Sequence, residues 1–164
     1  LKPLIYGGGH ENGLRSGTEN VPAIVGFGVA CELAKSRMPE TAIHVSKLRD
    51  HLEKGLIAMG AVIFGAAAAR IPNTCYFAIP DIEGDTLVVK LDKAGFAVAS
   101  GAACSSATPG KSHVLEAMGV APMLARCAVR ISLGHDNTLN QIDDFLKAIN
   151  KIVAALRQFN SMSA

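Results

Sequence analysis

The chain has 164 residues, 49% of them hydrophobic and 18% charged, a composition typical of one soluble globular domain. Its 16 Lys and Arg residues nearly balance 14 Asp and Glu and are scattered along the chain, which argues against nucleic acid as a partner. The longest apolar stretch, residues 22–34, is interrupted by Glu32 and is too short to cross a bilayer, and the N-terminus lacks a signal-peptide pattern. We therefore expect a soluble, cytoplasmic protein without a membrane segment.

The first 20 residues are predicted to be irregular and to lie unpacked or at an interface, because five glycines interrupt them and no apolar periodicity is sustained. From about Asn20, apolar residues recur at helical spacing, and Pro39 is expected to end or kink this helix. A second helix is predicted to continue to about Met59. The two helices are expected to form a bent pair.

The rest of the chain alternates short predicted strands and helices. Strands are predicted at residues 61–64, 74–79, 96–99 and 127–133, and helices at 81–95, 112–118 and 138–159. Gly119 and Pro122 are expected to stop the helix at 112–118. Gly95 stands where a helix C-terminal cap belongs, and Thr138 and Gln141 have capping-box spacing. This order predicts an α+β fold in which a small mixed or antiparallel sheet is flanked by helices.

The four cysteines are far apart, with neither a C-x-x-C pair nor the spacing of a zinc site, so the sequence predicts neither a disulfide framework nor a metal site. Cys31, Cys75 and Cys127 lie on a helical face or in strands and are interpreted as buried structural residues. Cys104 differs, because it follows a short strand in a run of Gly, Ala and Ser, where a thiol can be presented as a nucleophile. It can equally be a small hydrophobic residue that fills a gap.

Arg130 lies in an otherwise apolar predicted strand. Its guanidinium either meets a carboxylate or phosphate or reaches water from the polar side of the strand, and the residues alone leave both interpretations open. Residues 7–18 combine backbone N–H groups with Arg15, Ser16 and Thr18, which can bind a phosphate. A glycine-rich connection of this kind is also typical of a plain turn, and it matches no nucleotide-binding consensus.

Four segments are informative as motifs: residues 7–20 (GGGHENGLRSGTEN), 100–106 (SGAACSS), 112–119 (SHVLEAMG) and 129–134 (VRISLG). Together they resemble cysteine desulfurases of the class V aminotransferase superfamily, which are fold-type I pyridoxal phosphate enzymes. The match runs in the family's order and covers nearly the whole chain. It implies the small C-terminal lobe of such an enzyme, with residues 1–20 as an active-site or interface segment and residues 21–164 as the C-terminal domain.

The resemblance implies roles for three residues. Cys104 falls where the family places the thiolate that attacks the sulfur of the substrate L-cysteine, leaving alanine and a protein persulfide. Arg130 falls on the arginine that binds the substrate carboxylate. Thr18 falls on the threonine that reaches the phosphate of pyridoxal 5'-phosphate in the neighbouring subunit, which implies a homodimer. The persulfide sulfur would pass to an acceptor such as an iron-sulfur scaffold protein.

The family's Schiff-base lysine, the histidine that stacks on the cofactor and the aspartate on its ring nitrogen have no counterpart here, and Lys2 lacks the surrounding lysine motif. We therefore expect an upstream cofactor-binding domain to be absent and the 164 residues alone to be inactive. The alternatives are a non-enzymatic persulfide carrier or partner-docking module, a selenocysteine lyase, or a relative with another lyase or aminotransferase reaction. Cys104 argues against the last, because simple transamination needs no thiol.

Overall fold

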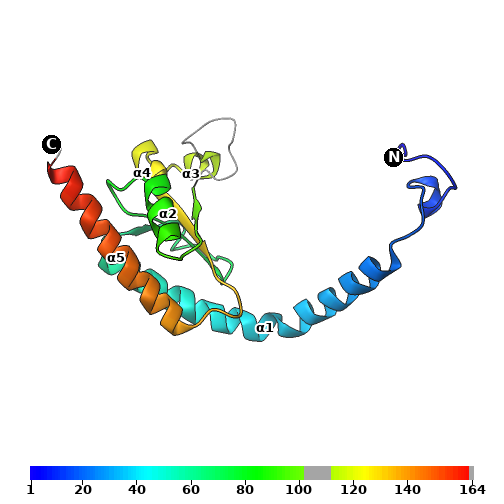
Figure 1. Cartoon of the computed structure of the whole chain (residues 1–164), viewed down its shortest axis with the longest axis horizontal. Helices are drawn as coiled ribbons and strands as arrows, with labels where there is room; N and C mark the ends of the chain where they lie inside the picture. Colours follow the sequence, from blue (N-terminus) through cyan, green and yellow to red (C-terminus); the bar gives the residue numbers. More distant parts are fainter. Residues whose placement is uncertain (102–111, 163–164) are drawn as a thin grey trace. The chain divides into compact units, whose positions relative to one another are not determined.

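The computed structural model describes residues 1–101 and 112–162, and side chains as far as residue 159. Contacts divide the chain into two compact units, Leu1–Pro39 and Glu40–Ala164, each of which is described by itself (Figure 1). Helix α1 (Val21–Ala58) continues through this boundary with Pro39 inside it. The expected pair of helices is therefore one helix, because the proline removes one backbone donor and the hydrogen bonds on either side persist. The predicted division into residues 1–20 and 21–164 stays a prediction about the whole protein.

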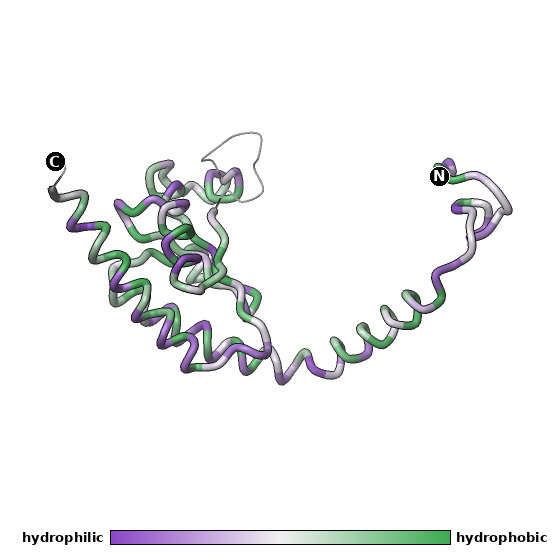
Figure 2. The backbone as a smooth tube through the Cα atoms, viewed as in Figure 1, coloured by the Kyte–Doolittle hydropathy of each residue, from purple (hydrophilic) through white to green (hydrophobic). Residues whose placement is uncertain are grey.

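The N-terminal unit begins with an irregular segment, as predicted, broken only by a 3-10 turn at Glu11–Gly13. Asn20 caps α1, since its side-chain oxygen accepts a hydrogen bond from the Ala23 N–H at 3.2 Å. The first half of the helix is rich in apolar residues, which appear green along the tube in Figure 2. Several of its large apolar side chains are exposed. They are Val21, Ile24, Val25, Phe27, Val29 and Leu33. This half of α1 therefore buries little apolar surface against its own unit.

The C-terminal unit is built on a four-stranded sheet in the order β1-β2-β4-β3, with every pair antiparallel. The strands are β1 (Val62–Ile63), β2 (Thr74–Ala78), β3 (Ala99–Ser100) and β4 (Ala128–Ser132). The two central strands pair from Thr74 opposite Ser132 to Ala78 opposite Ala128. The strands predicted at 61–64, 74–79 and 127–133 are confirmed, and β1 is shorter than expected. The strand predicted at 96–99 is displaced, because β3 shares only Ala99 with it.

One face of this sheet packs against α1, α2 (Gly84–Lys93) and α5 (Leu139–Met162). Alternate strand residues enter this core, and each helix contributes an apolar stripe. The helix residues are Val45, Leu48, Leu52, Leu56, Leu87, Leu91, Ile142, Phe145, Ile149 and Val153. In Figure 2 the stripe of α5 appears as alternating apolar and polar colour along the tube. Burying a side chain of this size stabilises the fold by roughly 1.5–3 kcal/mol.

The opposite face carries a smaller core of five buried residues, Phe64, Ala78, Leu115, Cys127 and Ala128. Two short helices, α3 (His113–Ala117) and α4 (Pro122–Arg126), supply the residues that cover it. The sequence did not predict α4, because Pro122 was interpreted as a stop. Proline at the first position of a helix removes no helical hydrogen bond, so Pro122 begins α4 instead.

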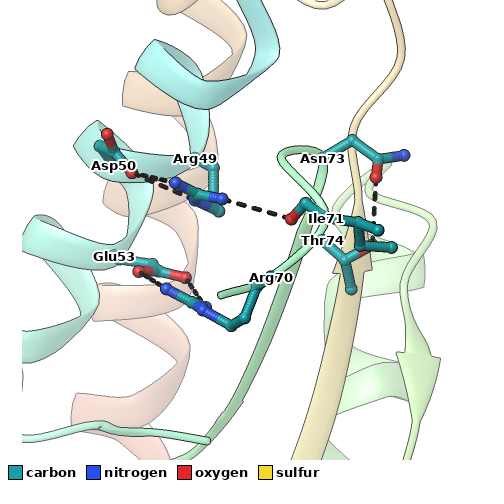
Figure 3. A network of polar contacts seen from close by, with 7 residues as sticks. All are labelled: Arg49, Asp50, Glu53, Arg70, Ile71, Asn73 and Thr74. Atoms are coloured by element: carbon teal, nitrogen blue, oxygen red, sulfur yellow. Dashed lines mark hydrogen bonds and ion pairs between the residues drawn. The ribbon is translucent and has the colours of Figure 1, made fainter. Parts of the chain in front are cut away.

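Polar contacts fasten the loop between β1 and β2 to helix α1 (Figure 3). Arg49 donates to the Ile71 carbonyl at 3.3 Å and also pairs with Asp50. Arg70 reaches back from the loop to the Glu53 carboxylate at 2.7 Å. These contacts fix the chain just before β2, the strand that pairs with the arginine-bearing strand β4.

Candidate active site

Arg130 occupies the middle of β4, with Tyr76 of β2 opposite on one side and Ala99 of β3 on the other. Residues directly opposite in an antiparallel pair share a face, so all three lie on the face with the smaller core. The Arg130 side chain is exposed, and no hydrogen bond or ion pair reaches its guanidinium from residues 1–101 or 112–162. An uncompensated guanidinium on a sheet face suits a carboxylate or phosphate ligand, which it binds through two parallel N–H groups.

The chain leaves β3 at Gly101, which is held to the same face by two hydrogen bonds. The Gly101 N–H donates to the Ala128 carbonyl at 2.9 Å, and the Tyr76 hydroxyl donates to the Gly101 carbonyl at 3.3 Å. Sequence reasoning missed Tyr76, because nothing in its spacing indicates a contact with a residue 25 positions away. Gly101 is three residues before Cys104.

The chain returns at Ser112, which is buried and caps α3. Its hydroxyl oxygen accepts a hydrogen bond from the Leu115 N–H at 3.4 Å, and Leu115 packs in the smaller core with Ala78 and Ala128. Gly101 and Ser112 therefore attach both ends of segment 102–111 to the sheet face that carries Arg130. Cys104 itself lies outside the described residues.

The other three cysteines differ in exposure. Cys75 and Cys127 are buried, as predicted, whereas Cys31 is exposed and that prediction is wrong. The physical reason is that the first half of α1 has no apolar partner within its own unit. Burial raises the pKa of the Cys75 thiol to about 12 and also raises the pKa of Cys127. Neither buried thiol is suited to act as a nucleophile at neutral pH.

Thr18 lies in the N-terminal unit, with an exposed side chain. The loop before it is tight, because Ser16 is buried with its hydroxyl accepting from the Gly9 N–H at 3.4 Å, and Arg15 donates to the Ser16 carbonyl at 2.7 Å. A Cβ atom at Gly17 would lie 2.5 Å from the Arg15 guanidinium. The segment therefore offers a hydroxyl, a guanidinium and glycine backbone N–H groups, which are donor types that fit a phosphate group.

A cavity of about 320 Å³ opens near Phe96 and Phe145, on the helix-covered side of the sheet. Its lining contains no titratable side chain, so it is not the candidate site. Within the described ranges, no cluster of three or more His, Cys, Asp or Glu residues is placed to hold a metal ion. No helix of that part of the chain has the length and hydropathy that a membrane span requires.

The geometry thus defines an α+β lobe that presents an arginine beside the two ends of a short segment. Residues 6–145 match the family described as Aminotransferase class-V, and the chain belongs to this family. It is 43% identical over 162 residues to a cysteine desulfurase of Gluconacetobacter diazotrophicus, covering 98% of this chain and 40% of the relative. It is 40% identical to cysteine desulfurase NifS of Azotobacter vinelandii, covering 96% of this chain and 40% of that protein.

Solved structures of NifS-like proteins share the fold. One has a TM-score of 0.81 at 43% identity, covering 94% of this chain and 39% of that chain. The NifS-like protein of Rickettsia africae has a TM-score of 0.79 at 38% identity, covering 93% and 40%. The predicted α+β class is confirmed. The chain spans about 40% of the length of the curated relatives it matches.

Proposed function

We propose that this chain is the C-terminal part of a cysteine desulfurase, which converts L-cysteine to L-alanine and retains the sulfur as a protein persulfide. One observation carries the proposal: an exposed Arg130 without a partner in the described chain shares a sheet face with both attachments of the segment that contains Cys104. The relatives named cysteine desulfurase, at 40–43% identity over nearly the whole chain, support it.

Arg130 is proposed to bind the substrate carboxylate. Its backbone is held between two neighbouring strands, so the Cα atom from which the side chain extends has a fixed position. A bidentate pair of this kind fixes orientation as well as position. A substrate whose carboxylate is held in this way would present its sulfur in one orientation relative to the sheet.

Cys104 is proposed to be the sulfur acceptor. Its thiolate attacks the substrate sulfur, an S–S bond forms, and the bond between that sulfur and the substrate β-carbon breaks. The electron pair of the broken bond stays on carbon and takes up a proton, so the products are alanine and a Cys104 persulfide. No external oxidant is needed, because sulfur is transferred and carbon is reduced in the same step.

Pyridoxal 5'-phosphate is the cofactor we propose, and when bound it supplies the electron sink for the carbon chemistry. Thr18 would hold its phosphate, together with the adjoining glycine-rich backbone, in the active site of a second subunit. A homodimer follows from this assignment. The lysine that would bind the cofactor covalently is proposed to lie outside these 164 residues, so that the chain alone is inactive.

The acceptor of the persulfide sulfur is proposed to be another protein, such as an iron-sulfur scaffold, and the compartment to be the cytoplasm, where thiols stay reduced. Selenocysteine lyase activity is the alternative within the same chemistry. A persulfide carrier without cofactor is the alternative outside it.

The test is to assay the full-length protein with L-cysteine for alanine and persulfide, comparing Cys104→Ser with Cys31→Ser, which also removes an accessible thiol. Cys104→Ser should abolish both products while the cofactor remains bound, and Cys31→Ser should retain both. Turnover that survives Cys104→Ser would refute the assignment. A parent that accepts sulfur only from an added persulfide would favour the carrier, and one that acts only on selenocysteine would favour the lyase.

A further inference from the structure

Tyr76 makes a contact that spans three strands. It lies on β2, yet its hydroxyl reaches the Gly101 carbonyl at the end of β3, and β4 runs between these two strands. Its ring is held on the other side by an edge-to-face contact with Phe64, with centroids 5.2 Å apart and an interplanar angle of 66°. The ring is thus fixed, and its hydroxyl holds a single backbone carbonyl.

The residues around this contact have sizes that permit it. A Cβ atom at Gly101 would lie 2.8 Å from the Tyr76 hydroxyl oxygen and 2.7 Å from the Ala128 Cβ. Only a glycine at Gly101 and a small residue at Ala128 leave room for the tyrosine to cross β4. Strand β3 has two residues, and one backbone hydrogen bond from Gly101 to Ala128 extends its pairing with β4. The Tyr76 hydroxyl adds a second hydrogen bond at Gly101.

We propose that Tyr76 is a positioning residue for the sulfur-transfer step. It fixes the backbone at Gly101, and because Cys104 follows three residues later, the position of Gly101 limits where the thiol can reach. Tyr76 also lies opposite Arg130 in the β2–β4 register. It therefore neighbours the proposed substrate-binding arginine and at the same time contacts Gly101, the last described residue before Cys104. This inference rests on the proposed desulfurase function.

The test uses the full-length protein with Tyr76→Phe, which keeps the ring and removes only the hydroxyl. Thr74→Val is the matched control, because it removes a hydroxyl from the same strand and face that bonds only its neighbour Asn73, at 3.5 Å. Two quantities are measured: the single-turnover rate of alanine formation, and the dissociation constant for L-cysteine from the change in cofactor absorbance. Thermal unfolding of both variants is recorded alongside.

Tyr76→Phe should slow alanine formation by about three- to tenfold, the worth of one hydrogen bond, while the dissociation constant stays within about twofold. Thr74→Val should change neither quantity. An unchanged rate in Tyr76→Phe overturns the inference while the parent's activity still supports the proposed function. Equal losses of rate and affinity also overturn it, because they would place the effect on substrate binding. An inactive parent defeats the proposed function, and the inference falls with it.

Gly101→Ala is the second variant, because its new methyl group would crowd the Tyr76 hydroxyl as well as the Ala128 Cβ and leaves Tyr76 itself unsubstituted. It should slow the same step if it folds, and this decides the inference should Tyr76→Phe fail to fold. Loss of folding in both variants would show a purely structural contact and would overturn the inference.

Discussion

The Arg70 guanidinium donates two hydrogen bonds to the Glu53 carboxylate, at 2.7 and 3.0 Å, and so joins the loop after β1 to helix α1. Glu53 is buried, and the hydrogen bonds to its carboxylate raise the pKa of Arg70 further above its ordinary value. The two charges therefore satisfy each other where water is scarce. Removing either one leaves the other poorly solvated, which is the costly outcome for a buried pair.

We expect Glu53→Gln to lower the free energy of unfolding by about 1–3 kcal/mol, because an amide cannot accept two charge-assisted hydrogen bonds. The matched control is Asp50→Asn, whose carboxylate pairs with Arg49 but is exposed, and we expect it to cost no more than about 0.5 kcal/mol. Urea denaturation of the two variants measures the difference. Equal losses of unfolding free energy in the two variants would show that the buried Glu53–Arg70 pair contributes no more to stability than the exposed Asp50–Arg49 pair.

Gly84 marks a close approach between the start of α2 and strand β4. A Cβ atom there would lie 2.6 Å from the Ala128 carbonyl oxygen and 3.1 Å from that of Arg126, and backbone atoms do not yield easily. Gly84→Ala should therefore destabilise the chain by about 1–3 kcal/mol. Gly134→Ala, where the nearest atom is 3.9 Å away, should stay within about 0.5 kcal/mol of the parent in the same thermal or urea measurement. Similar values for both would contradict the predicted clash.

The sequence alone predicted those elements whose signals lie in neighbouring residues, such as helix caps and short apolar strands. The capping box at Thr138 and Gln141 is present, with reciprocal hydrogen bonds of 3.0 and 3.3 Å. Three of the four strands lie where the apolar and β-branched residues predicted them, and β3 begins at the last residue of its predicted range. Gly95 follows α2 with a φ of +88°, a conformation that favours glycine. Pro122 was misinterpreted, because the same residue can stop a helix or begin one, and spacing does not separate the two cases.

The candidate site was predictable only in part. A charged residue in an apolar strand drew attention to Arg130, and the residues alone left open whether it binds an anion or reaches water. The structure shows that its side chain is exposed. The contact between Tyr76 and Gly101 depends on strand order, which places β4 between them, and no periodicity encodes that order. The exposure of Cys31 likewise depends on what covers α1, a tertiary property. The roles of Cys104 and Thr18 remain predictions from the family resemblance.

The buried thiol of Cys75 should make stability fall at alkaline pH. Burial raises its pKa from the ordinary value of 9.0 to about 12, so the folded protein holds this proton more tightly than the unfolded chain does. The resulting stabilisation is complete below about pH 9 and is lost as the pH rises toward 12, with a slope of about 1.4 kcal/mol per pH unit. Cys75→Ala lacks this titration, and its free energy of unfolding should decline less steeply above about pH 9. Urea titrations at several pH values measure both slopes, and parallel curves would contradict the assignment.

Arg130 should act on substrate binding and not on folding. In the full-length protein, Arg130→Gln should raise KM for L-cysteine by about 10- to 100-fold, because charge-assisted hydrogen bonds to the substrate carboxylate contribute roughly 1.5–3 kcal/mol. The stability of the variant should stay within about 0.5 kcal/mol of the parent, since the side chain is exposed and has no partner in the described part of the chain.

Arg126→Gln is the control for this change, because Arg126 is an exposed arginine whose pair with Glu83, at 3.4 Å, is unrelated to the site. It should leave KM unchanged. Equal effects of the two substitutions would mean that general positive charge attracts the substrate, whereas a rise in KM confined to Arg130→Gln requires a specific contact at β4. A fall in kcat at constant KM would instead assign Arg130 to the chemical step.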